Sequence, residues 1–105
     1  MQRATPTELQ GRLSSGEKIT IVDVREDEEL EICRLSEAIH IPLGEITARH
    51  TELDPDESYA LLCHHGIRSA QAAGFLIQQG FQHVINIEGG IERWAVEVDA
   101  TLERY

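Results

Sequence analysis

The chain has 105 residues, and its nine Lys and Arg stand against nineteen Asp and Glu, which gives a formal net charge of −10. A chain of this length predicts one compact domain over residues 1–105. The acidic balance argues against broad electrostatic binding to nucleic acid or to an anionic membrane surface, and no segment is long and apolar enough to span a bilayer.

The first predicted element is a helix that begins after Thr5. Thr5, Pro6 and Glu8 combine an N-cap residue, a proline at the first helical position and a capping-box glutamate. Gly16 then predicts the end of this helix.

Further elements alternate in type along the chain. Runs of β-branched and other apolar residues predict four buried strands, at 19–24, 38–41, 59–62 and 83–87. Helical patterns lie between them or after the last one, at 26–35, 47–53, 67–79 and 91–98. Strands separated by helices indicate an α/β fold with a parallel sheet and right-handed crossovers.

The two cysteines, Cys33 and Cys63, are too few for the disulfide framework of a small secreted domain. The first residues also lack the apolar stretch of a secretory signal. We therefore expect two free thiols and a cytoplasmic protein.

One loop combines a nucleophile with features that attract an anion. The strand 59–62 runs into Cys63, and a helix is predicted to begin about four residues later. This spacing lets successive backbone N–H groups and the helix N-terminus point toward one place, with Gly66 supplying the freedom that a tight loop needs. Such a cradle stabilises a thiolate, which is the nucleophilic form of cysteine, and Arg68 adds a permanent cation. The electrostatic field at this loop can therefore be positive although the chain as a whole is acidic.

Four ordered segments of the sequence resemble the rhodanese domain, a sulfurtransferase module. The loop Cys-His-His-Gly-Ile-Arg-Ser at 63–69 is similar to the family's active-site loop. The segments at 21–26 with 29–30, at 38–43 and at 89–94 are similar to its Asp-Val-Arg, Ala-x-x-Ile-Pro and Gly-Gly-x-x-x-Trp motifs. The resemblance implies a rhodanese-like α/β domain with a central parallel sheet of four to five strands and helices on both faces.

The resemblance also implies a chemistry. Cys63 would attack the outer sulfur of a donor such as thiosulfate, become a persulfide, and pass that sulfur to cyanide or to a thiol. The loop would hold the small anionic donor through the residues that follow the cysteine, which are His64, His65, Gly66, Ile67, Arg68 and Ser69. No cofactor and no metal is needed, because the thiolate is already the attacking species. A cysteine desulfurase or a sulfur carrier is compatible with the family as a sulfur-relay partner.

The sequence departs from the family pattern beside the cysteine. Members that use thiosulfate well often have Arg or Lys just after the cysteine, where this chain has His64 and His65. Because histidine is only partly charged near neutral pH, the cationic help would come from Arg68. This departure weakens the case for thiosulfate as the natural donor.

Several other residues have a structural interpretation. We expect Arg25 to belong to the scaffold, Cys33 to be a packing residue, and Trp94 and the tail 102–105 to pack in the core and at its edge.

Two other classes of function remain as alternatives. Thiolate phosphatases and arsenate reductases also use a Cys…Arg loop, but the resemblance to them calls for five residues between the two, whereas Cys63 and Arg68 are separated by four. A non-catalytic rhodanese-like binding module is the other alternative, although such modules typically lose the cysteine.

Overall fold

The computed structural model describes all residues 1–105, and its strands form one parallel sheet. The strands are β1 (Gln2–Ala4), β2 (Ile19–Asp23), β3 (Ile39–His40), β4 (Ser58–Leu62) and β5 (His83–Ile87). Their order across the sheet is β1-β5-β4-β2-β3. The predicted parallel sheet is confirmed. The edge strand β1 was not among the predicted strands, because its three residues carry no alternating or β-branched pattern.

The α-helices are α1 (Pro6–Ser14), α2 (Asp27–Ile32), α3 (Ile46–Arg49), α4 (Ile67–Gln78) and α5 (Gly90–Glu97). Short 3₁₀ turns, η1 (Leu43–Glu45) and η2 (His50–Glu52), flank α3. The capping box of Thr5 and Glu8 at the start of α1 is confirmed. The helix predicted at 26–35 ends early, because Cys33 adopts an extended backbone. The helix predicted at 47–53 is instead a mixture of α and 3₁₀ turns.

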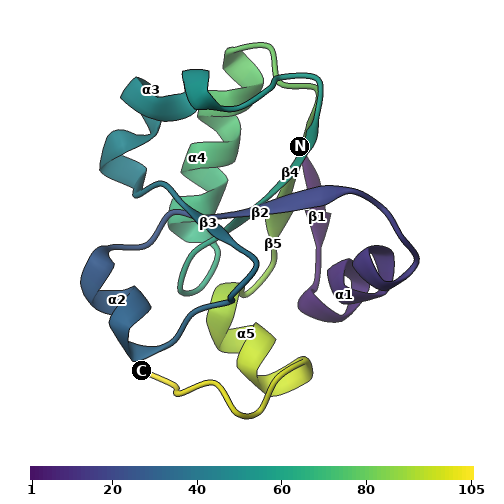
Figure 1. Ribbon diagram of the computed structural model, residues 1–105, viewed down its shortest axis with the longest axis vertical. Helices are drawn as coiled ribbons and strands as arrows, with labels where there is room; N and C mark the ends of the chain where they lie inside the picture. The colour runs from purple at the N-terminus through teal and green to yellow at the C-terminus, as the bar shows by residue number, and fades with distance from the viewer.

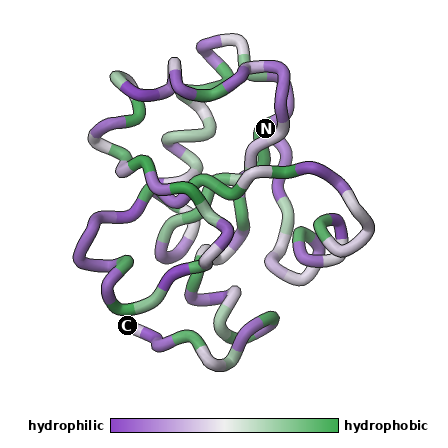
Figure 2. The backbone as a smooth tube through the Cα atoms, in the orientation of Figure 1, coloured by the Kyte–Doolittle hydropathy of each residue, from purple (hydrophilic) through white to green (hydrophobic).

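Helices cover both faces of the sheet (Figure 1). Neighbouring strand residues alternate between two hydrophobic clusters, as side chains of a pleated strand do: Leu61 joins the cluster beneath α4 and Leu62 the cluster beneath α1 and α5. Figure 2 shows hydrophobic residues gathered along the central strands, with hydrophilic residues on many of the outer turns. This double burial explains why the strands are nearly continuous apolar runs.

Parallel pairing also brings the carboxyl ends of β2, β4 and β5 to one edge of the sheet. The loops after these strands therefore meet there, which is where open α/β sheets bind ligands. None of the helices is both long enough and apolar enough to cross a membrane.

Candidate active site

The loop that begins at Cys63 lies at this carboxyl edge, directly after β4. Gly66 adopts a left-handed backbone with φ of 107°, a conformation that favours glycine, and α4 begins at the next residue, Ile67. The loop is therefore as short as its sequence predicts. Cys63 is almost completely buried, with 1% of its surface exposed.

Polar groups surround the sulfur of Cys63. The backbone N–H of Gly66 donates a hydrogen bond to Sγ over 3.0 Å, and the thiol donates to Oγ of Ser69 over 3.3 Å. The Ser69 hydroxyl in turn donates to Oδ1 of Asn86 over 2.5 Å, while Nδ2 of Asn86 donates to the Gly66 carbonyl over 3.1 Å. The bonds from Asn86 of β5 fix the Gly66 carbonyl and the Ser69 hydroxyl beside the sulfur, and the Gly66 N–H can stabilise negative charge on it.

The N-terminus of α5 holds the loop from its other side. The N–H of Ile91 donates to the Cys63 carbonyl over 2.9 Å, and the N–H of Glu92 donates to the His64 carbonyl over 3.2 Å. Gly90 lies so close to both carbonyl oxygens that a Cβ atom there would stand 2.4 Å from each. With these carbonyls turned toward α5, the loop can turn N–H groups toward the sulfur.

Arg68 lies in the loop as its sequence predicts, and its cation is paired with a carboxylate. Its guanidinium forms a two-bond ion pair with Glu29 of α2, with Nη1 to Oε1 at 2.5 Å and Nη2 to Oε2 at 2.8 Å. The hydrogen bonds from Arg68 lower the pKa of Glu29 to about 2, so this carboxylate is charged near neutral pH. The sequence does not reveal the pair, because its members lie 39 residues apart.

The two histidines of the loop differ in environment. His65 is exposed, whereas the His64 ring is mostly covered and lies 3.9 Å, centroid to centroid, from both the His65 and Tyr105 rings. Nε2 of His64 is buried without a hydrogen bond and lies 4.0 Å from Glu92. Burial is the main cause that lowers the pKa of His64, with the nearby His65 second. His64 therefore carries little positive charge near neutral pH.

The tail was expected only to pack, and that interpretation is incomplete. Leu102 does pack against the core, but Tyr105 reaches the site. Its hydroxyl donates to Oε2 of Glu29 over 2.6 Å and accepts from Nη1 of Arg25 over 3.0 Å. The scaffold role of Arg25 is confirmed: it is fully buried and bound to Asp23 over 2.7 Å.

The interpretations of Trp94 and of the two cysteines agree with the geometry. Trp94 and Cys33 are buried in the cluster beneath α1 and α5. Both cysteines are free thiols. No group of three or more His, Cys, Asp or Glu side chains is arranged to hold a metal ion.

The structure thus brings the predicted loop together and adds four residues to it: Glu29, Asn86, Gly90 and Tyr105. Asn86 had a detectable signal in the sequence, since it is a polar residue inside an apolar strand and such residues need a buried partner. Tyr105 had no such signal.

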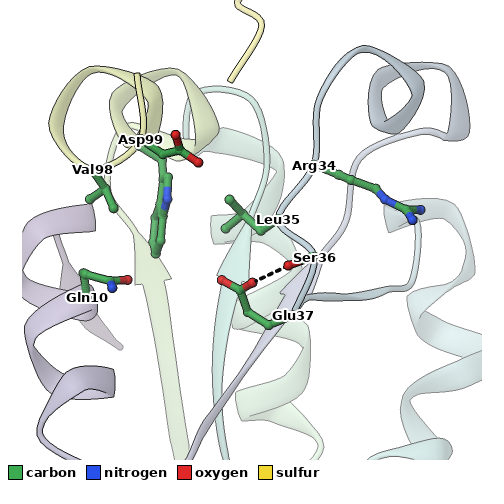
Figure 3. A pocket seen from close by; sticks show the side chains of 8 residues that line it. Gln10, Arg34, Leu35, Ser36, Glu37, Val98 and Asp99 are labelled. Carbon is green, nitrogen blue, oxygen red and sulfur yellow. Dashed lines mark hydrogen bonds between the residues drawn. The ribbon is translucent and has the colours of Figure 1, made fainter. Parts of the chain in front are cut away.

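No surface hollow is lined by a residue of the loop 63–69. A polar groove of about 330 Å³ lies elsewhere, between α1, the 34–37 segment and the end of α5 (Figure 3).

Comparison with known proteins agrees with this geometry. The family model described as a rhodanese-like domain matches residues 5–97. YtwF of Bacillus subtilis, which carries a sulfurtransferase name, is 36% identical over 85% of this chain and 85% of its own. YrkF of the same organism, which carries a sulfur carrier name, is 41% identical over 79% of this chain, and the match spans only 45% of YrkF. The crystal structure of a rhodanese-related protein from Thermoplasma volcanium is 34% identical with a TM-score of 0.84, covering 93% of this chain and 94% of that one.

Fold and loop together define an α/β domain with a buried thiol that accepts a hydrogen bond from a loop N–H. The chain belongs to the rhodanese-like domain family. Membership of this family, with relatives named for sulfur transfer, supports sulfur transfer as the general activity.

Proposed function

We propose that the chain is a sulfurtransferase that carries sulfane sulfur as a persulfide on Cys63. The observation that carries this proposal is the 3.0 Å hydrogen bond from the Gly66 N–H to Sγ at the carboxyl end of β4. A donor aimed at this sulfur stabilises the thiolate before transfer and charge on the persulfide after it.

The transfer occurs in two displacement steps. The Cys63 thiolate attacks the outer sulfur of thiosulfate, a new S–S bond forms on Cys63, and sulfite leaves with the electron pair of the broken bond. Cyanide or a thiolate then attacks the outer sulfur of the persulfide and restores the Cys63 thiolate. Charge and atoms balance in both steps, so neither needs a metal, a cofactor or an external oxidant.

The loop residues would have different roles in this reaction. The backbone N–H groups of His64, His65, Gly66 and Ile67 would form the cradle, of which the Gly66 N–H bonds to Sγ. The Ser69 hydroxyl lies 3.3 Å from Sγ and would hold the sulfur in place. Arg68 would meet the anionic end of a donor only after its bonds to Glu29 loosen.

A sulfur-relay partner, such as a cysteine desulfurase or a sulfur carrier, is the proposed physiological context. The acidic surface suits a partner with a basic docking face, because charge complementarity steers association. Two free thiols suit a reducing compartment, so we propose a cytoplasmic location.

The experiment is a thiocyanate assay with thiosulfate and cyanide, run on Cys63→Ser and on Cys33→Ser as the matched control. The proposal expects loss of turnover in the first variant and parental turnover in the second. Cys63→Ser that transfers sulfur at the parental rate would overturn it. An aryl phosphate is assayed in parallel, and robust Cys63-dependent phosphate release would assign the loop to phosphatase chemistry instead.

A further inference from the structure

The carboxylate of Glu29 is bound to Arg68, the arginine of the Cys63 loop. Both terminal nitrogens of Arg68 donate to Glu29, which uses the side of the guanidinium fork that binds an oxyanion in two-bond geometry. The side chains are partly covered, with 33% of Arg68 and 18% of Glu29 exposed, so water screens the pair less than it would an exposed one.

Glu29 is itself held in place by groups other than Arg68. Its Oε1 accepts the N–H of Glu26 over 3.1 Å within the capping box of α2, and its Oε2 accepts the Tyr105 hydroxyl over 2.6 Å. The Tyr105 ring lies almost parallel to the His64 ring, at 11° and 3.9 Å. The carboxylate therefore cannot swing away from Arg68 without breaking its bonds to the N-cap of α2 and to the C-terminal tail.

No second arginine of this network is free to compensate for this pairing. Arg25, the other arginine of the network, is bound to Asp23, and burial keeps His64 largely neutral near pH 7. The side chains next to the thiol thus add one positive charge from Arg68 and one negative charge from Glu29. These two charges cancel, so backbone N–H dipoles and the exposed His65 are what remain to balance an incoming anion.

The charge of the donor decides how strongly the pairing of Arg68 with Glu29 disfavours its binding beside the thiolate. Thiosulfate brings two negative charges toward a thiolate that already carries one, whereas a thiol persulfide brings one when it is ionised and none when it is protonated. For the protonated persulfide the reaction is Cys63–S⁻ + R–SSH → Cys63–SSH + R–S⁻. Cys63 attacks the outer sulfur, the S–S bond of the donor breaks, and the thiolate R–S⁻ leaves. Like-charge repulsion in a covered site falls mainly on thiosulfate.

We propose that Glu29, positioned by Tyr105, is a specificity-determining residue that withholds Arg68 from the donor and so favours thiol persulfides over thiosulfate. This inference rests on the proposed sulfur transfer at Cys63. It accounts for a Cys…Arg loop that matches an anion-binding site in sequence while its arginine is already paired.

The test compares two donors, thiosulfate and the persulfide of N-acetylcysteamine, with cyanide as the acceptor. Glu29→Gln keeps the shape and the capping bond of the side chain and removes its charge. The matched control is Glu28→Gln, an exposed neighbour on the same helix that changes net charge equally. Glu29→Gln is expected to raise kcat/KM for thiosulfate about tenfold, mainly through KM, and to change the persulfide value less than about threefold. Glu28→Gln should change neither.

Tyr105→Phe tests the positioning role separately. It keeps the ring on His64 and removes the hydroxyl that binds Glu29, so thiosulfate KM should fall by a smaller factor than in Glu29→Gln. A parental KM in Tyr105→Phe would remove Tyr105 from the proposal.

The inference is overturned if Glu29→Gln leaves thiosulfate KM unchanged or raises it, or if both donors respond by the same factor. If the proposed sulfur transfer at Cys63 is itself wrong, the experiment gives a different result. In that case neither donor would place sulfur on Cys63 in the parental protein.

Discussion

Gly90→Ala is the sharpest structural test of how the Cys63 loop is built. A methyl group at this position would stand 2.4 Å from the carbonyl oxygens of Cys63 and His64, and φ of Gly90 is +60°. Both oxygens belong to backbone, so no side-chain rotation relieves the contact. Either the loop or the start of α5 has to move.

The cost follows from two separable contributions. A left-handed backbone costs a non-glycine residue about 1–2 kcal/mol. Movement of the loop also weakens the hydrogen bonds from Ile91 and Glu92 to the two carbonyls, at about 1 kcal/mol each. We therefore expect Gly90→Ala to lower the free energy of unfolding by about 3–4 kcal/mol.

Gly80→Ala is the matched control, because Gly80 also has a positive φ, +95°, but a Cβ atom there meets nothing within 4 Å. It should show only the backbone cost of about 1–2 kcal/mol. Urea unfolding measures both values, and the rate of Cys63 persulfide formation should fall in Gly90→Ala alone. Equal destabilisation of the two variants, with equal rates, would refute the role assigned to the start of α5.

Three further predictions concern the buried network. Arg25→Met leaves the carboxylate of Asp23 buried without its partner and should lower the free energy of unfolding in urea by about 3–5 kcal/mol. Much of this stability should return when Asp23→Leu is added. Full stability in the single variant would contradict the pairing. The pKa of Glu29, lowered to about 2 by Arg68, means that the pair stabilises the fold above the unfolded pKa near 4.5 and that this contribution disappears as pH falls from there toward 2. The stability difference between the parent and Glu29→Gln should therefore shrink over that pH range, and a constant difference would count against the ion pair. Asn86→Ala leaves a buried carbonyl and a buried hydroxyl without their partner and should cost about 1–3 kcal/mol, with slower persulfide formation; a parental rate would show that this side chain does not support the loop.

Much of the fold is predictable because its signals are local. The capping box at Thr5 and the left-handed Gly80 after α4 each mark a helix end through interactions within a few residues. The central strands are visible because both of their faces are buried. The edge strand β1 is not visible, since its pairing with β5 depends on residues more than 80 positions away, such as the Gln2 and Ile85 pair.

The candidate site divides in the same way. The loop from Cys63 to Ser69 is contiguous, so its residues and their spacing are visible in the sequence. The pairing of Arg68 with Glu29 and the contact of Tyr105 with both Glu29 and His64 join distant segments, and no residue pattern encodes them. These long-range contacts add to the interpretation of Arg68 that its cation is paired.

The most direct measurement of the central claim is to locate the transferred sulfur. The protein is incubated with thiosulfate or a thiol persulfide, its intact mass is recorded, and the modified peptide is mapped before and after treatment with cyanide. The account predicts one added sulfur atom on Cys63, lost to cyanide, with Cys33 unmodified. Sulfur carried on Cys33, or no cyanide-labile sulfur with either donor, would contradict it.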